Sequence, residues 1–396
     1  MTPDLLDLFG LKDLIGCLPP LKNATDVCGT VSKETAERTG LKEGTPVAGG
    51  MFDIDACAVA MDVTDEENLC VIAGTWSINE YIRPRPVVDG KVMMNSFFCL
   101  PGYYLIEECS PTSAGNNEWF VQNLLPELKA ELKKTGGNIY QQMDRWTDSI
   151  PVQEQCPIFF PFLMASNVHP NAMGSFVGMS NFHTRAHLAR SVYEGIAFSH
   201  RYHLEKLLAT RDQAPRGIRL AGGVARSQVW TQMFADVMKL PVEVVQVNET
   251  GALGCAVIGA AASGEYASLA DAAAHMCRIS QPIMPDQIRS RLYDEKYELY
   301  LQAIQALDPL WDRLQEYRDR HPQADPRRSN GADKFVDKGQ GRSRRDGLHF
   351  VLTAGEVIGA VGKGVPIPGK AAQLAHEFLQ ITPTLPPRIT GSPAAY

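Results

Sequence analysis

The sequence has no long hydrophobic run. None of its segments contains the roughly 18 uninterrupted apolar residues that a membrane-spanning helix needs. The first residues, MTPDLLDLFGLKDLIGCLPP, carry acidic groups where a secretory signal has a basic region. The sequence therefore predicts no membrane-spanning segment, no secretory signal and no membrane partner.

Closely spaced cysteines and an excess of basic charge are also missing. The nine cysteines are scattered, odd in number and never arranged as C-x-x-C, which indicates neither a disulfide framework nor a zinc site. The net charge of −7 argues against a general nucleic-acid-binding protein. A cytoplasmic protein in a reducing compartment agrees best with this composition, and we expect no nucleic-acid partner.

An α/β pattern is present up to about Tyr317, in a chain of 396 residues that is long enough for two domains. Apolar runs such as LCVIAG and PIFFPFL alternate with segments of helical periodicity. Leu188, Val192 and Ile196 recur at helical spacing, and GIRLAGG, PVEVVQV and GALGCAVIGAAA follow in turn. We therefore predict a strand–helix–strand–helix unit on a mixed β-sheet.

The composition changes abruptly after about His321, where Pro, Gly, Arg and Lys become frequent. This change predicts a domain boundary followed by a mostly disordered tail. The tail contains GVPIPGKA, residues 364–371, which has the Gly-x4-Gly-Lys frame of a P-loop. Ala371 replaces the Ser or Thr that holds magnesium, and Pro366 and Pro368 have no N–H for a phosphate, so we do not interpret it as a P-loop.

Two acidic residues, Asp53 and Asp55, stand between a glycine pair and a run of small residues in VAGGMFDIDACAVAM. The preceding TPVAGG predicts a buried strand that runs into a turn, and ACAVAM predicts the start of a helix. Carboxylates at such a strand end are accessible to a ligand. The alternative is that one of them, Asp55 in particular, caps the helix N-terminus.

Two glycine turns have the character of phosphate-binding loops. In CVIAGTWSINEY, Gly74 and Thr75 follow an apolar strand and can offer N–H groups and a hydroxyl to a phosphate, although an ordinary hairpin is the alternative. In LAGGVARSQVWTQMFADV, Gly222 and Gly223 lie between a strand and a helix expected to begin near Ser227. That arrangement favours a nucleotide, and a tight turn with a serine cap is its alternative.

These segments together resemble one family. GSFVGMSNFHTRAHLARSVYE, residues 174–194, matches the second signature pattern of the FGGY carbohydrate kinases. GTPVAGGMFD, AGTWS, AGGVARSQVWTQMFADV and NETGALGCA resemble the family in its own order, over about residues 2–317. SPTSAGNNEWF, residues 110–120, looks most like the xylulokinase and L-xylulose kinase branch.

The resemblance implies an actin-like, ribonuclease H-like ATPase domain that transfers the γ-phosphoryl group of ATP to a sugar hydroxyl. It implies ATP and Mg²⁺ as cofactors and a pentulose as substrate, and we assign no metal-ligating residue. Asp53 aligns with the family's catalytic base, which accepts the proton of the attacking hydroxyl. Asp55 has no such counterpart. The resemblance further assigns a second phosphate motif (Gly74, Thr75), an adenosine motif (Gly222, Gly223, Ser227) and a connecting motif (residues 249–254) where helices cross and domains hinge.

One departure from the family is large. Its N-terminal domain holds a first phosphate motif of the Asp-x-Gly type and most of the sugar pocket, and no such turn occurs near this N-terminus. We therefore expect only the C-terminal half: residues 1–45 as a remnant of the N-terminal FGGY domain, 46–320 as the C-terminal domain, and 321–396 as a low-complexity tail.

Two interpretations of function follow from this departure. In the first, the chain is a pentulose kinase whose missing N-terminal half is supplied by a partner polypeptide or was lost in gene calling, so that the isolated chain is inactive. In the second, it is a non-catalytic nucleotide-binding or interaction module derived from a kinase half. Either interpretation is compatible with a homodimer.

Overall fold

The computed structural model describes residues 3–8 and 10–321. The chain divides into two compact units, residues 1–26 with 49–321 and residues 27–48 with 322–396. The predicted disordered tail and its GVPIPGKA segment lie outside the described residues.

The described part of the smaller unit is a two-stranded antiparallel sheet, β1 (Val27–Thr30) and β2 (Pro46–Ala48), with α2 (Lys33–Thr39) between them. The predicted strand in TPVAGG is present as β2, but the prediction that it is buried is wrong. Its residues are exposed or half-buried. The reason is that β2 pairs only with the exposed β1, and α2 has no buried residue with which to cover the pair.

The larger unit is built on a six-stranded sheet with the order β10-β9-β3-β4-β6-β5. The strands are β3 (Asn68–Ala73), β4 (Ser77–Arg83), β5 (Met94–Phe97), β6 (Tyr104–Ser110), β9 (Gly217–Gly222) and β10 (Val242–Val244). β10, β9 and β3 are parallel, whereas β4 is antiparallel to both β3 and β6. The predicted mixed sheet is therefore confirmed, and β3, β6, β9 and β10 all run in one direction, with their carboxyl ends at one edge.

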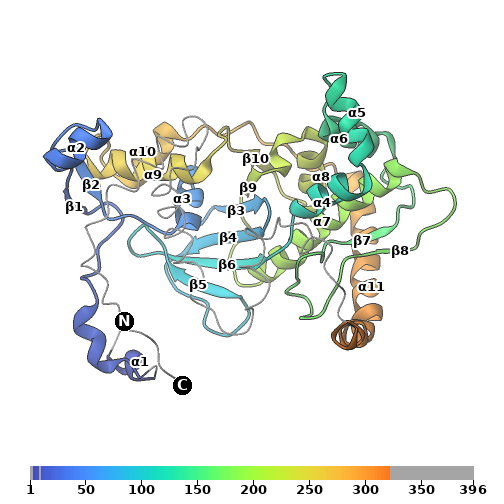
Figure 1. Ribbon diagram of the computed structural model, residues 1–396, viewed down its shortest axis with the longest axis horizontal. Coiled ribbons are helices and arrows are strands. Elements are labelled where there is room, and N and C mark those ends of the chain that lie inside the picture. The colour runs from blue at the N-terminus through green and yellow to red at the C-terminus, as the bar shows by residue number, and fades with distance from the viewer. Residues whose placement is uncertain (1–2, 9, 322–396) are drawn as a thin grey trace. The chain divides into compact units, whose positions relative to one another are not determined.

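Helices and a second small sheet complete this unit (Figure 1). They are α1 (Pro3–Leu8), η1 (Lys12–Cys17), α3 (Asp53–Ala60), α4 (Gly115–Leu124), α5 (Pro126–Lys134), α6 (Ile139–Ser149), α7 (Arg185–Leu208), η2 (Val224–Arg226), α8 (Gln228–Met238), α9 (Thr250–Ala262), α10 (Leu269–Met276) and α11 (Gln287–Arg320), with the antiparallel pair β7 (Ile158–Phe160) and β8 (Ser175–Val177). The order β9-α8-β10-α9 confirms the predicted strand–helix–strand–helix unit. None of the described helices is long and apolar enough to cross a membrane.

Two consecutive residues of β6 show how the sheet is covered. Successive side chains on a strand point to opposite faces. Glu108 meets His203 of α7 at 3.0 Å, so that face packs on α7. Glu107 points the other way and acts electrostatically on Asp55 of α3. The sheet therefore lies between α7 on one face and α3 on the other.

Helix α7 is the central helix of the core. As predicted, Val192 and Ile196 are buried, and Leu188 packs partly buried against the same cluster. The ring of Tyr193 stacks on Trp230 of α8 with centroids 4.0 Å apart. Since α7 also buries polar residues on its sheet-facing side, it can hold hydrogen-bonding groups directly beneath the edge where the strands end.

Candidate functional site

The turn between β3 and β4 consists of Gly74, Thr75 and Trp76. The N–H of Gly74 donates to the carbonyl of Trp76 at 3.2 Å, which closes the hairpin. Thr75 and Trp76 are exposed, so the hydroxyl of Thr75 is accessible to a ligand. The predicted strand–turn–strand is confirmed, while contact of Gly74 and Thr75 with a phosphate stays a prediction.

The turn after β9 lies beside this hairpin. The N–H of Gly223 donates to the carbonyl of Ala73 at 2.9 Å. Gly222 has φ +93°, and a Cβ there would lie 2.5 Å from the carbonyl oxygen of Ala73, so no other residue fits without strain. The structure therefore brings the two predicted glycine turns together, at the carboxyl ends of adjacent parallel strands.

A third turn, between β6 and α4, completes this edge and was not assigned to the site from the sequence. The N–H of Ser113 donates to the carbonyl of Thr75 at 3.1 Å. A Cβ on Gly115 would lie 3.5 Å from that same oxygen, so the N-terminus of α4 lies against Thr75. The small residues of SPTSAG after an apolar strand were the available signal. Ligands of open α/β sheets commonly bind at the carboxyl ends of strands.

Ser227 has a structural function in the fold. The predicted helix start is confirmed, because α8 begins at Gln228 with Ser227 as its N-cap. The hydroxyl accepts from the N–H of Trp230 at 3.0 Å and donates to Oδ1 of Asp144 at 2.7 Å. The serine-cap alternative is therefore present, and contact of Ser227 with adenosine stays a prediction.

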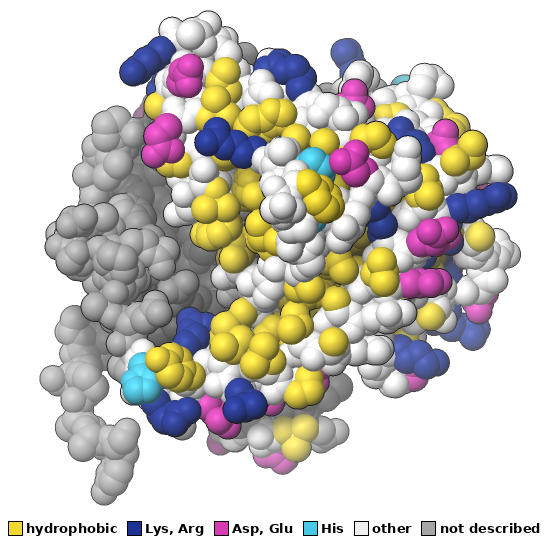
Figure 2. All heavy atoms as spheres, turned by 90° about the vertical axis from the view of Figure 1, so that its right-hand side faces the viewer, with side chains coloured by type: hydrophobic (Ala, Val, Ile, Leu, Met, Phe, Trp, Pro, Cys, Tyr) yellow, Lys and Arg dark blue, Asp and Glu magenta, His cyan; other side chains and the backbone are white. Residues whose placement is uncertain are grey.

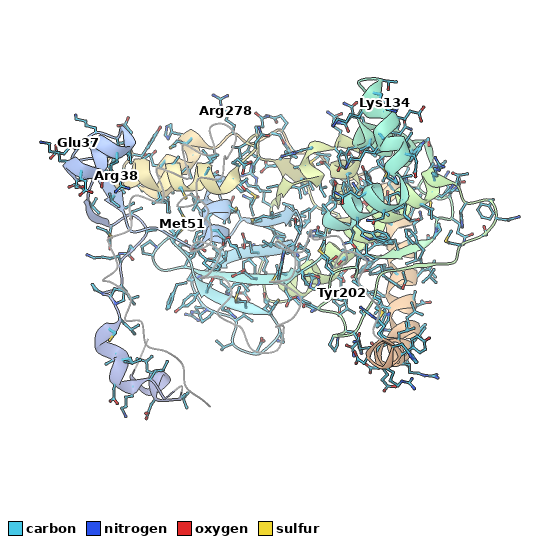
Figure 3. The ribbon with its side chains drawn as sticks, in the orientation of Figure 1. Glu37, Arg38, Met51, Lys134, Tyr202 and Arg278 are labelled. Carbon is cyan, nitrogen blue, oxygen red and sulfur yellow. The ribbon has the colours of Figure 1, made fainter. Side chains whose placement is uncertain are left out.

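Asp53 is the first residue of α3 and is exposed. Met51, which is labelled in Figure 3, lies two residues before it in the segment that leads into the helix. Its Oδ1 accepts the N–H of Ile54 at 2.9 Å. Among the described residues no hydrogen bond joins Asp53 to either glycine turn, so its catalytic function stays a prediction that rests on accessibility.

Asp55 does not cap α3, so the cap interpretation is wrong for this residue, whereas the carboxylate of Asp53 does accept an N–H of the first turn. The helix begins two residues earlier than Asp55, with Phe52 at the N-cap position, so Asp55 falls in the first turn and faces inward. Only 4% of Asp55 is exposed, and its Oδ1 has no hydrogen-bond partner. Burial, followed by the charge of Glu107, raises the pKa of Asp55 to about 7, against the opposing effect of a backbone hydrogen bond from Cys99.

Asp55 belongs to a buried group of carboxyls that the sequence did not indicate. Glu80 and Glu107 are cross-strand neighbours on β4 and β6, and both are fully buried. Burial raises the pKa of Glu107 to about 7 and that of Glu80 well above its usual range. Arg219, in the same row of the sheet, already pairs with Asp62 and Glu243. The described residues contain no group of three or more His, Cys, Asp or Glu suited to a metal ion.

Helices α3 and α9 cross at the predicted connecting motif. A Cβ on Gly254 would lie 1.9 Å from the carbonyl oxygen of Ala56, so the two backbones are in direct contact there. Sγ of Cys57 and Oγ1 of Thr250 are 3.3 Å apart at the same crossing. The prediction that small residues let two helices cross is confirmed, and a hinge function of this crossing stays a prediction.

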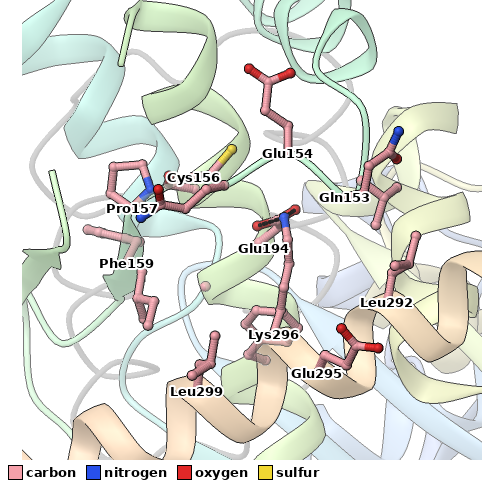
Figure 4. A pocket seen from close by; sticks show the side chains of 16 residues that line it. Gln153, Glu154, Cys156, Pro157, Phe159, Glu194, Leu292, Glu295, Lys296 and Leu299 are labelled. Carbon is pink, nitrogen blue, oxygen red and sulfur yellow. Dashed lines mark hydrogen bonds and ion pairs between the residues drawn. The ribbon is translucent and has the colours of Figure 1, made fainter. Parts of the chain in front are cut away.

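A cavity of about 310 Å³ lies between α7, α11 and residues 152–159 (Figure 4). Its polar floor is the ion pair of Glu194 and Lys296, with Nζ 2.9 Å from Oε1. None of the predicted site residues lines it. On the face shown in Figure 2, acidic and basic side chains are interspersed with hydrophobic ones. The three turns, and not this cavity, are therefore the candidate site.

Two family models match the chain. The model for the C-terminal domain of the FGGY family of carbohydrate kinases matches residues 69–263, and that for the N-terminal domain matches residues 2–60. The prediction of the C-terminal half only is therefore wrong. It rested on the missing Asp-x-Gly turn, whereas the N-terminal match extends through Asp53. The predicted boundary at residue 45 is not tested by these matches.

Curated relatives include L-xylulose/3-keto-L-gulonate kinase of Escherichia coli (strain K12). It is 34% identical over 324 residues, which cover 80% of this chain and 61% of the relative. Probable L-xylulose kinase of Haemophilus influenzae (strain ATCC 51907 / DSM 11121 / KW20 / Rd) is 34% identical over 315 residues, covering 77% of this chain and 60% of the relative. The chain thus spans about three fifths of the length of these relatives.

Solved structures of sugar kinases are similar in fold to this chain. Xylulose kinase from Rhodospirillum rubrum has a TM-score of 0.68 at 27% identity, covering 77% of this chain and 61% of that one. Xylulose kinase from Lactobacillus acidophilus has the same fold, with a TM-score of 0.68 at 22% identity, covering 78% and 61%. The fold is the actin-like ATPase fold of these sugar kinases, as predicted. The two models of one family together match more than half of the chain, which shows that it belongs to the FGGY family of carbohydrate kinases.

Proposed function

We propose that the chain is the nucleotide-binding and catalytic part of an ATP-dependent pentulose kinase. The observation that carries this proposal is the meeting of three turns at the carboxyl ends of β3, β6 and β9. The names of the relatives, L-xylulose kinase and xylulose kinase, support a pentulose as the substrate class. A cytoplasmic location belongs to the same proposal.

The phosphates bind beside Thr75 in this proposal. Thr75 is exposed, and its hydroxyl can donate to a phosphate oxygen. The N-terminus of α4, which contacts Thr75, adds the positive end of a helix dipole. Gly222 and Gly223 are exposed and carry no side chain, so the nucleotide can approach the backbone after β9.

Asp53 is the proposed base. Its exposed carboxylate accepts the proton of the sugar hydroxyl while that oxygen bonds to the γ-phosphorus and the bond to the β,γ-bridging oxygen breaks, releasing ADP. Mg²⁺ would neutralise phosphate charge in this step. Because the described residues hold no cluster suited to a metal, we propose that Mg²⁺ binds mainly through the phosphates.

The remaining part of the sugar pocket is proposed to come from an N-terminal kinase half. The relatives are longer than their match to this chain. An exposed apolar surface supports a docking partner, because the first 21 residues expose Leu8, Leu11, Leu14, Ile15, Leu18 and Leu21. The alternative is a non-catalytic nucleotide-binding module, which the incomplete coverage of the relatives also allows.

The test combines nucleotide titration with an ADP-release assay on xylulose, L-xylulose and ribulose. We expect ATP to bind the chain alone, and turnover to require an added N-terminal segment from a full-length relative. ATP binding without turnover in the completed enzyme would support the module instead. Absence of ATP binding would contradict both functions.

A further inference from the structure

A buried hydrogen-bond chain lies directly beneath the turn that carries Thr75. At its centre is His200 of α7, which is fully buried. Its Nε2 is 2.7 Å from Oγ of Ser113, and its Nδ1 is 2.9 Å from Oδ1 of Asn79 and 3.1 Å from Oγ of Ser77. Ser77 is the first residue of β4 after the turn, and Ser113 precedes α4.

The hydrogen-bond partners assign the protons in this chain. The Asn79 amide nitrogen donates to the carbonyl of Glu108 at 3.1 Å, which leaves Oδ1 facing His200. Because Oδ1 can only accept, Nδ1 of His200 carries the proton and Nε2 accepts from the hydroxyl of Ser113. Burial lowers the pKa of His200 to about 3, so the ring stays neutral and this arrangement persists at physiological pH.

Ser113, His200 and Asn79 have the order of a nucleophile, a base and an orienting group. Burial rules out a covalent reaction at this serine, because Ser113 is 1% exposed and His200 is 0% exposed, so no acyl or phosphoryl donor can reach the hydroxyl. The chain does connect to the proposed phosphate site through the backbone, since the N–H of Ser113 donates to the carbonyl of Thr75.

We infer that His200 is a positioning residue that holds the β3–β4 turn and the β6–α4 turn in the geometry needed to bind the phosphates of ATP. The inference rests on the proposed function. One ring nitrogen is bonded to the β4 residues that follow Thr75, and the other is bonded to the residue whose N–H holds the carbonyl of Thr75. His200 thus fixes the turn from both sides.

Substitutions can separate the two sides of the ring. His200→Asn keeps a donor near the position of Nδ1 and loses the acceptor for Ser113. His200→Gln reaches further and restores an acceptor near the position of Nε2. Ser113→Ala removes the same hydrogen bond from the other end. The matched control is His203→Gln, a buried histidine one turn further along α7 whose partner is Glu108.

The readout is the affinity of the chain for ATP and for adenosine, measured below the unfolding temperature of each variant. We expect His200→Asn and Ser113→Ala to weaken ATP about 3- to 10-fold and adenosine less than about 2-fold. His200→Gln, which keeps the bond to Ser113 but loses the bonds to β4, should recover part of the ATP affinity, and His203→Gln should keep it. Equal losses for ATP and adenosine, or no loss for ATP, would overturn the inference.

Hydrogen exchange separates this inference from the proposed function. If the wild-type chain binds no ATP, the proposed function fails, and the inference that the phosphates are positioned fails with it. The tether itself is tested by the exchange rate of the Ser113 amide, which should rise in His200→Asn but not in His203→Gln. An unchanged rate in His200→Asn would show that His200 does not hold the turn, whatever the nucleotide result.

Discussion

Glu80 and Glu107 lie directly opposite each other on the antiparallel strands β4 and β6, and neither side chain is exposed to solvent. Like charges at such a cross-strand pair repel each other, and burial removes the water that would screen them. Asp55 of α3 adds a third buried carboxyl that is coupled to Glu107. The arrangement is stable only when protons occupy part of the group.

The folding stability should therefore fall as the pH rises toward 8. The pKa of Asp55 and of Glu107 is raised to about 7 in the folded chain, from ordinary values of 3.8 and 4.5. Their stabilising contribution is complete below about pH 4 and is lost as the pH rises through 7, with a slope of up to about 1.4 kcal/mol per pH unit for each proton. Glu107→Gln should flatten this dependence, measured by urea unfolding between pH 5 and 8.

Glu108 provides the control for that experiment. Although burial raises its pKa, the hydrogen bond from His203 and the charge of Lys206 lower it overall. Glu108→Gln should therefore remove stability that is present at neutral pH and lost in acid, which is the opposite trend. A steeper loss of stability above pH 6 in Glu107→Gln than in the wild type would contradict our assignment.

Gly222→Ala should destabilise the chain by more than about 1 kcal/mol, because the residue has φ +93° and the added Cβ meets the carbonyl of Ala73. Gly74→Ala should leave the unfolding midpoint nearly unchanged, since no atom lies within 4 Å of an added Cβ there. ATP titration of Gly74→Ala then measures the phosphate contact alone. Wild-type ATP affinity in Gly74→Ala would count against this turn as the phosphate site.

Gly254→Ala should force α3 away from α9, because its Cβ would lie 1.9 Å from the carbonyl oxygen of Ala56. Gly259→Ala, on the same helix with open space around it, should stabilise the chain by about 0.5–1 kcal/mol through helix propensity. Thermal unfolding of the pair tests the crossing. Equal midpoints would show that the two helices do not depend on close approach.

Asp53→Asn should abolish turnover of the completed enzyme, with a loss of about 10²–10⁴-fold in kcat, because the amide cannot accept the hydroxyl proton. Asp55→Asn should keep turnover, since Asp55 is buried away from solvent. The ADP-release assay on both variants compares them directly. Turnover that survives in Asp53→Asn would remove Asp53 as the base.

Local sequence patterns predicted the glycine turns at the carboxyl ends of the strands, but they did not predict which of these turns contact each other. Gly74, Gly222 and Gly223 follow apolar strands, so their turns could be located from the sequence alone. Whether β3 and β9 are neighbours is decided by the sheet order, which no local pattern contains. The wrong interpretation of Asp55 arose because the helix start was placed three residues too late, at Ala56 instead of Asp53, a shift that moves a side chain from the cap to the core.

The polar groups behind the site were beyond prediction for a different reason. His200 meets Ser113 and Asn79 across 87 and 121 residues of chain. A histidine on a helix that is otherwise rich in buried residues gives no local sign of its partners. Glu80 and Glu107 likewise occupy strand positions where alternation alone would place charged side chains toward solvent.

The neighbouring glutamates of β6, Glu107 and Glu108, also determine the register in which β6 pairs with β4. A slip of one residue against β4 would exchange the two faces. Glu108, which now bonds to His203, would then enter the group of buried carboxyls, where Arg219 is already paired with Asp62 and Glu243. Glu107, which holds a proton, would meet His203 and Lys206. Two chemically identical side chains thus select one pairing register of the sheet, because only that register gives each carboxyl the ionisation state that its surroundings require.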